Sequence, residues 1–295
     1  MSGLKQLRSR IKSIKSTQKI TKAMQIVSAT KFTKAKSQIK DSEDYIEILR
    51  NTMSNVASRN NLQNMTEEEK KFFSSDVNIN KPHLLVVVTS ERGLCGSFNF
   101  AVFKQVKFDI ANLENAGKQV RLIIIGKKGY DLFKWQYSHY IDNYYDFPKY
   151  HNNNLAFQIK DKITEMVDSG KISSCQIYFN KCKNAITQIA TKQQILPIEQ
   201  QLSSSEQYSS EQYLSYEYEG EGLVLNMINL YVTAQINYAL LQSRVSEEGA
   251  RMTTMDNATK NANELINKLT LTLNRSRQDI ITRDLIEIIA GAEAI

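Results

Sequence analysis

The first 56 residues repeat apolar side chains with the seven-residue spacing of a coiled coil. Between Leu4 and Val56, eleven of the sixteen inner heptad positions are apolar. Four of the five polar exceptions are consecutive inner positions, from Gln18 to Ser28. In that window the apolar residues occupy other positions, namely Ile20, Ala23, Met24, Ile26, Val27 and Ala29. This pattern indicates either a local stutter in the coil or a segment that meets a second partner besides its sister helix.

The C-terminal end of the chain carries the same pattern. From Met227 to Ile280, thirteen of the sixteen inner heptad positions are apolar. The register then shifts, and the last turns are apolar on most faces, which predicts that they are enclosed by something. At 1.5 Å per residue the two terminal helices would span roughly 80 and 100 Å. Helices from opposite ends of one chain pair most simply in an antiparallel coiled coil, which leaves the tip of the longer one unmatched.

The middle of the chain alternates strand and helix patterns. Strands are predicted, with the last two weaker, at Leu84–Thr89, Val120–Ile125, Ile177–Phe179, Ser138–Phe147 and Ala185–Ile195. Helices are predicted between them at Phe98–Ala116, Lys127–Gln136 and Leu155–Ser169. This alternation predicts an α/β fold with a mostly parallel, doubly wound, Rossmann-like sheet. We expect helices of a coiled-coil shaft at 1–60 and 222–295, an α/β domain at 80–200, and a polar surface connection over residues 200–222.

The charge of the chain predicts a negatively charged partner. The 295 residues carry a net charge of +7, and the first forty hold eleven Lys or Arg and no acid. Charge runs are often only solvated faces, but this asymmetry favours a polyanionic neighbour. The continuous heptad pattern argues against a removable basic leader. No apolar run approaches the roughly 20 residues of a helical membrane span, and three unevenly spaced cysteines favour a reducing compartment.

The turn after the first strand is the most obvious place for chemistry. It reads E-R-G-L-C-G-S-F-N over Glu91–Asn99, but Gly93 and Gly96 are not followed by the third glycine of a dinucleotide-binding turn. The G-K-K-G run from Gly126 to Gly129 lacks the spacing of a phosphate-binding loop. Cys95 has no obvious base beside it, and no His or Cys residues have zinc-ligand spacing. We therefore expect a tight corner, and no catalytic residue, cofactor or metal.

Three long stretches carry a family resemblance. They are I-K-S-I-K-S-T-Q-K-I-T-K-A-M-Q-I-V-S-A-T-K-F (Ile11–Phe32), S-E-R-G-L-C-G-S-F-N (Ser90–Asn99), and the forty-odd residues from A-R-M-T-T-M-D-N to I-E-I-I-A-G-A (Ala250–Ala292). In these stretches and in their order the chain resembles the γ subunit of the F-type ATP synthase, most closely the mitochondrial form. From Asp131 to Gly222 the match is only one of general pattern.

The resemblance implies a rotor without catalytic residues of its own. Such a subunit forms the central stalk, couples rotation of the membrane c-ring to ATP synthesis at the β subunits, and lies on the matrix side of the mitochondrial inner membrane. Its implied partners are the α and β subunits of the head, the δ and ε subunits, and the c-ring, with no nucleic acid and no membrane span. The apolar sleeve of the head would enclose the C-terminal tip, and acidic β loops would be the polyanionic neighbour.

The resemblance also implies contacts of particular residues with the α/β ring. The matching positions are Met24, Arg251, Arg277, Gln278, Thr282 and Asp284. Asp284 stands where glutamate is common in the family, which keeps the charge but shortens the reach by one methylene. Two positions also have purely structural explanations: seam packing for Met24, and an ion pair with Glu247 or Glu248 for Arg251.

Three other functions fit parts of the sequence. A nucleic-acid-binding protein with a basic helical arm would bind in a strongly salt-dependent way, but no reading motif is visible. A nucleotide-dependent enzyme would bind its ligand through the α/β domain. A homodimeric tether would require each helical seam to prefer a second copy of itself.

Overall fold

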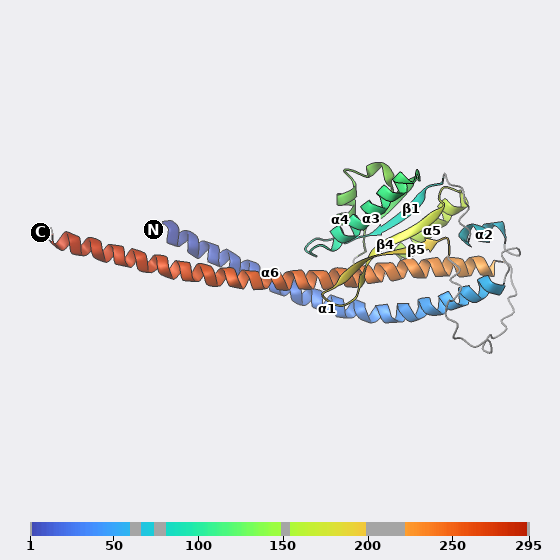
Figure 1. Cartoon of the computed structure of the whole chain (residues 1–295). Coiled ribbons are helices and arrows are strands. Elements are labelled where there is room, and N and C mark those ends of the chain that lie inside the picture. Colours follow the sequence, from blue (N-terminus) through green and yellow to red (C-terminus); the bar gives the residue numbers. More distant parts are fainter. Residues whose placement is uncertain (1, 60–65, 74–80, 149–153, 199–221, 294–295) are drawn as a thin grey trace. The chain divides into compact units, whose positions relative to one another are not determined.

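A computed structural model describes residues 2–59, 66–73, 81–148, 154–198 and 222–293 (Figure 1). The chain divides into two compact units. One comprises Met1–Thr30 and Arg251–Ile295, and the other comprises Lys31–Ala250. Two long helices contribute to both units, α1 (Ser2–Arg59) and α6 (Leu223–Glu293). The predicted connection at 200–222 lies almost entirely outside the described residues.

The larger unit contains a five-stranded sheet with the order β3-β2-β1-β4-β5. The strands are β1 (His83–Val88), β2 (Val120–Ile125), β3 (Ile141–Tyr145), β4 (Ser174–Cys182) and β5 (Gln188–Leu196). The first four strands in this order run parallel and β5 is antiparallel to β4. The predicted α/β class is therefore confirmed. One predicted strand is shorter than expected, because Ser138–Tyr140 forms a 3-10 helix, η2, before β3 begins.

Helices cover both faces of this sheet, which explains why β1 and β2 are apolar at all but one position each. The helices α3 (Phe98–Asn115) and α4 (Lys127–Phe133) pack on one face, where Val102, Val106 and Phe133 meet the sheet. The helices α5 (Asn154–Asp168) and α6 pack on the other. Residues of α6 in that core are Ile228, Val232, Ile236, Ala239 and Leu240.

A short helix, α2 (Glu67–Phe73), was missed in the sequence. Seven residues are too few to show helical periodicity. Its signal is a capping box in which the Thr66 backbone N–H donates to Glu69 Oε2 at 2.9 Å and the Glu69 N–H donates to Thr66 Oγ1 at 3.4 Å. Phe72, only 2% exposed, anchors this helix in the core.

The terminal helices pair antiparallel within each unit. In the larger unit, Ala35 and Ile39 of α1 pack against Leu241 and Val245 of α6. In the smaller unit the pairing runs through polar side chains, because Thr21 and Thr259 share a hydrogen bond of 2.8 Å between their hydroxyls. Further bonds join Gln18 to Asn263 (3.0 Å) and Gln25 to Asp256 (2.8 Å).

The heptad register therefore continues through the polar window of α1, and the structure shows no stutter there. Thr21 and Ser28 are buried at inner positions. Ile20, Ile26 and Val27 instead face away from the seam, each more than half exposed. Of the two explanations that the sequence allowed, the exposed apolar side chains favour a surface for a second partner.

The tip of α6 has no partner helix among the residues that the structure describes. Each step forward along α1 in the smaller unit is matched by a step back along α6, so the start of α1 at Ser2 lies level with about Asp279. Beyond that level, described residues of α6 are exposed on every face. The large apolar ones are Ile281, Leu285, Ile286, Ile288 and Ile289, exposed by 49–68%.

Candidate functional site

The turn after β1 is a tight corner held by its own side chains. Asn99 Oδ1 accepts the Ser90 backbone N–H at 2.9 Å, and Asn99 Nδ2 donates to Ser90 Oγ at 2.8 Å. Ser90 Oγ in turn donates to the Arg92 carbonyl at 2.7 Å. Leu94 has a φ of 65°, which marks how sharply the backbone reverses. These bonds hold the turn closed on itself through Ser90 and Asn99.

The glycines after β2 allow close packing against Thr89. Thr89 Oγ1 donates to the Ile125 carbonyl at 2.8 Å and accepts the Gly129 N–H at 2.9 Å. A Cβ at Gly126 would lie 2.4 Å from the Thr89 carbonyl oxygen, and a Cβ at Gly129 would lie 2.4 Å from Thr89 Oγ1. Thr89 is fully buried, so the G-K-K-G run packs against protein at both of its glycines.

The crevice between the carboxyl ends of β1 and β4 is occupied by α6. Doubly wound sheets bind their ligands at this point, where the strand order reverses. Here Asn180 Nδ2, at the end of β4, donates to the Phe98 carbonyl at 2.9 Å, and Ser246 Oγ donates to the Asn180 carbonyl at 2.7 Å. Phe98 and Cys95 pack against Ala250 of α6. The nucleotide-dependent enzyme therefore loses its most plausible site.

The cysteines are poorly placed for chemistry. Cys95 is 3% exposed, and its Sγ accepts a hydrogen bond from Asn99 Nδ2 at 3.5 Å. Burial raises the pKa of the Cys175 thiol, and it also raises that of Cys182 despite nearby Lys36, which acts in the opposite direction. Over the described part of the chain, no three His, Cys, Asp or Glu residues gather as a metal site.

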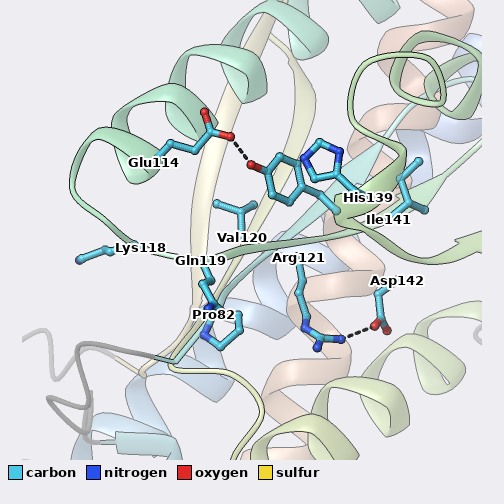
Figure 2. Close-up of a pocket in the computed structure, with 10 residues that line it drawn as sticks. Pro82, Glu114, Lys118, Gln119, Val120, Arg121, His139, Ile141 and Asp142 are labelled. Carbon is cyan, nitrogen blue, oxygen red and sulfur yellow. Dashed lines mark hydrogen bonds and ion pairs between the residues drawn. The ribbon is translucent and has the colours of Figure 1, made fainter.

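A cavity of about 540 Å³ opens at the amino ends of the parallel strands (Figure 2). One ion pair and one hydrogen bond lie among its lining side chains. Arg121 and Asp142 approach to 2.6 Å, and the Tyr140 hydroxyl donates to Glu114. That bond and burial raise the pKa of Tyr140. The cavity lies at the opposite edge from the one where this fold binds cofactors. Its lining holds two acidic and two basic side chains, Glu114, Lys118, Arg121 and Asp142, so it carries no net formal charge.

The six residues expected to contact partners all belong to the smaller unit. Arg277, Gln278, Thr282 and Asp284 are exposed on the last turns of α6, among the apolar side chains of its tip. Met24 is half-buried on α1. Arg251 differs from the others, since it is only 7% exposed. Four of the six are thus exposed on the last turns of one helix.

Sequence reasoning passed over a second set of polar residues on α6. Gln235, Gln242 and Ser246 are buried and face the hairpin formed by β4 and β5. They lie off the inner heptad positions, so counting along the seam did not find them. Amides and hydroxyls recur along this stretch of α6, so the residue types alone do not single out these three.

These features define the class of protein. Long paired helices, an exposed apolar tip, and an α/β domain whose ligand edge is filled are typical of a subunit that works through contacts with other proteins. Among the helices that the structure describes, none combines the length and hydropathy needed to cross a membrane.

Comparison with known proteins identifies the family. A family model described as ATP synthase matches residues 3–295. The chain is 60% identical to the ATP synthase gamma chain of Rickettsia felis and 59% identical to that of Rickettsia prowazekii, each over 100% of both chains. The chain therefore belongs to the ATP synthase gamma chain family.

Solved structures agree with this assignment. The chain is similar to the central stalk and c-ring structure of the Tetrahymena thermophila mitochondrial ATP synthase, with a TM-score of 0.59 and 26% identity over 81% of this chain and 99% of that one. It also shares its fold with a chain of the Euglena gracilis mitochondrial ATP synthase, with a TM-score of 0.70 and 19% identity over 99% of this chain and 94% of that one.

Proposed function

We propose that the chain is the central-stalk rotor of a proton-translocating F-type ATP synthase. It carries torque between the ring of c subunits in the membrane and the β subunits of the head, where catalysis takes place. The observation that carries this proposal is the tip of α6, which continues past the end of α1 with apolar side chains on its surface.

The exposed tip would be costly in an isolated protein. Fully burying an Ile or Leu side chain is worth about 1.5–3 kcal/mol, so enclosing the exposed halves of five of them recovers roughly 5 kcal/mol. The sleeve of α and β subunits at the centre of the head supplies such an enclosure. We expect the isolated chain to aggregate through this tip, and a monodisperse isolated chain would contradict the argument.

Polar residues at the tip would then make directed contacts with the sleeve. Arg277 and Gln278 bond a loop of β, and Thr282 and Asp284 occupy neighbouring contact positions. Their exposure, among side chains that need covering, supports this assignment. Met24 and Arg251 complete the set, with Met24 near the acidic loops of β. The eleven basic residues of the first forty give that end of α1 the complementary charge.

Different parts of the chain contact the remaining partners. The helices at 1–60 and 222–295 form the shaft, and the α/β domain at 80–200 forms, with the lower coil, a foot on the c-ring beside the δ and ε subunits. The filled ligand edge of the sheet supports a purely mechanical role for this domain.

The membrane on which the complex works is a separate question. The sequence resemblance suggested the matrix side of the mitochondrial inner membrane. Relatives of 57–60% identity are bacterial chains, whereas the mitochondrial structures are 17–26% identical. We therefore favour the inner face of a bacterial coupling membrane, as a peripheral subunit. Cell fractionation, with the chain followed by antibody, tests this choice. Sedimentation of the chain with mitochondrial markers would support the mitochondrial inner membrane instead.

The proposed function is tested by purifying the chain from its native membranes in mild detergent. We expect α, β and c subunits in the mass spectrum, together with ATPase activity. Recovery of nucleic acid would support the basic-arm alternative instead, and recovery of the chain alone as a dimer would support the tether.

A substitution on the shaft tests the mechanism. Met24→Lys should lower the number of protons pumped per ATP hydrolysed while leaving assembly intact, because a new cation would bind the acidic β loops too tightly in one rotary state. Met24→Leu, which keeps the apolar surface, is the control and should pump normally. Equal coupling ratios in the two purified complexes would sink the idea.

A further inference from the structure

One face of α6 carries a row of buried polar residues that lies toward the sheet of the α/β domain. Gln235, Gln242 and Ser246 are exposed by 1%, 2% and 0%, and Gly249 follows one turn later. Their separations of seven, four and three residues place them along one side of the helix. Burying amides and hydroxyls is costly unless they are bonded, so this row has a specific partner.

The partner is the hairpin of β4 and β5. The Ser246 hydroxyl donates to the Asn180 carbonyl at 2.7 Å, and Gln242 Oε1 accepts the Cys182 backbone N–H at 3.2 Å. Further along the hairpin, the Gln193 amide donates to Gln235 Oε1. At its turn, the Ala185 carbonyl lies 3.2 Å from where a Cβ on Gly249 would stand. The hairpin is thus fastened to α6 over about four helical turns.

Gln242 ties a third element into the same contact. Its Nε2 donates to Glu43 Oε1 of α1 at 3.2 Å and to the Tyr238 hydroxyl at 3.0 Å. Tyr238 also donates to Glu43 at 3.0 Å, and burial together with this bond raises its pKa to about 12. A single amide side chain therefore joins the hairpin, α6 and α1 at one level.

These hydrogen bonds fix the orientation of α6 more strictly than the neighbouring apolar core does. Apolar contact is non-directional, so the packing of α6 beneath the sheet resists rotation of the helix only through the shapes of its side chains. Hydrogen bonds to main-chain groups weaken steeply when their angles change. Bonds from Gln242 and Ser246 to the backbone of β4 therefore fix both the rotation of α6 and its position along the hairpin.

We propose that this hairpin clamp, made of Gln235, Gln242, Ser246 and Gly249, fixes the α/β domain to α6 and carries torque between them. The inference rests on the proposed rotor function and adds its positioning residues. A torque that turns the domain about α6 is resisted first at these bonds, and loosening them lets the domain slip under load.

The test uses the assembled complex, with wild-type chain or one of three variants. Gln242→Leu removes the three-way bridge at nearly constant volume, and Ser246→Ala removes one hydroxyl. The exchange E43Q/Q242E reverses the amide and the carboxylate, so that an acceptor still faces Cys182 and the donor now lies on α1. Asn226→Leu, an exposed amide on the same helix, is the matched control.

The measured quantity is the number of protons pumped per ATP hydrolysed, as a function of the opposing proton gradient. For Gln242→Leu and Ser246→Ala we expect the ratio to fall about fivefold at high gradient, as one or two lost hydrogen bonds imply, and to match wild type at low gradient. A general loss of stability would lower the ratio equally at all gradients. The E43Q/Q242E complex and the Asn226→Leu control should pump normally.

The outcomes separate this inference from the rotor function. If the wild-type chain fails to give a coupled complex, the proposed function fails. If wild type couples and both single variants follow it at every gradient, or the E43Q/Q242E exchange fails to restore what Q242L loses, the clamp is overturned and the rotor stands. Should Gln242→Leu not assemble, Ser246→Ala decides, supported by hydrogen exchange at the β4–β5 hairpin, which the clamp predicts to be faster.

Discussion

Gly129→Ala isolates the packing of the G-K-K-G run against Thr89. The added methyl group would stand 2.4 Å from Thr89 Oγ1, 2.8 Å from Thr89 Cγ2 and 3.1 Å from Ile124 Cγ2. Thr89 cannot move cheaply, because its side chain is β-branched, fully buried and bonded to the Ile125 carbonyl. The substitution must therefore either strain this contact or break it.

The sizes of three opposing free-energy changes decide whether Gly129→Ala stabilises or destabilises the domain. Overpacking a core costs about 1–3 kcal/mol, and a hydrogen bond lost by Thr89 costs about 1 kcal/mol more. Against this, alanine gains about 1 kcal/mol over glycine inside a helix. The expected result is a net loss of about 2 kcal/mol in the free energy of unfolding of the α/β domain. Since 1.4 kcal/mol is tenfold, protected amides should exchange about 30 times faster.

Native-state hydrogen exchange of β1 and β2 measures this loss directly. The control is Gly291→Ala, which makes the same change in a helix where nothing lies within 4 Å of the new methyl group. It should leave exchange in β1 and β2 unchanged. If Gly129→Ala exchanged as slowly as wild type, the glycine would not be needed for close packing, and the account of this corner as filled by protein would be wrong.

Three further predictions concern other parts of the fold. Replacing Thr21 and Thr259 together by valine should slow amide exchange in that part of the coiled coil, because a polar seam pair costs stability while it sets the register; faster exchange would contradict this. Burial, aided by Lys118 and Lys192, lowers the pKa of His83, so the unfolded chain binds more protons as the pH falls below 6.5. Wild type should therefore lose melting temperature over that range more steeply than His83→Gln, and parallel curves would refute the assignment. Cys95→Ala should leave the ATPase rate of the assembled complex unchanged, whereas an inactive complex would reopen the question of a catalytic thiol.

Local patterns predicted most of the helices and strands, because each of these elements depends mainly on the side chains of neighbouring residues. The run Val120–Ile125 matches β2 residue for residue, since a strand buried on both faces is apolar at nearly every position. The strand β4 extends three residues beyond the prediction at each end, because pairing with β5 continues through Asn180 and Cys182. At this end of β4, α6 bonds two main-chain groups, the Cys182 N–H and the Asn180 carbonyl, from outside the local sequence.

The candidate site was likewise predicted from the sequence only in part. Sequence placed the exposed polar residues of the α6 tip correctly among its apolar ones, because both lie on one helix. It could not show that Arg251 is buried or that Ile20, Ile26 and Val27 face away from the seam, because both depend on how α1 and α6 are rotated. That rotation is set by pairs such as Thr21 and Thr259, 238 residues apart.

Sequence alone thus determined the long terminal helices, the α/β class and the family, because heptad spacing, strand–helix alternation and long matching stretches are properties of neighbouring residues. Only the tertiary structure decided that the ligand edge of the sheet is closed. That closure requires Ser246 and Ala250, near the middle of α6, to meet Asn180 and Phe98 from the central domain. No local pattern encodes such a meeting, because it depends on the register with which a distant helix packs against the sheet.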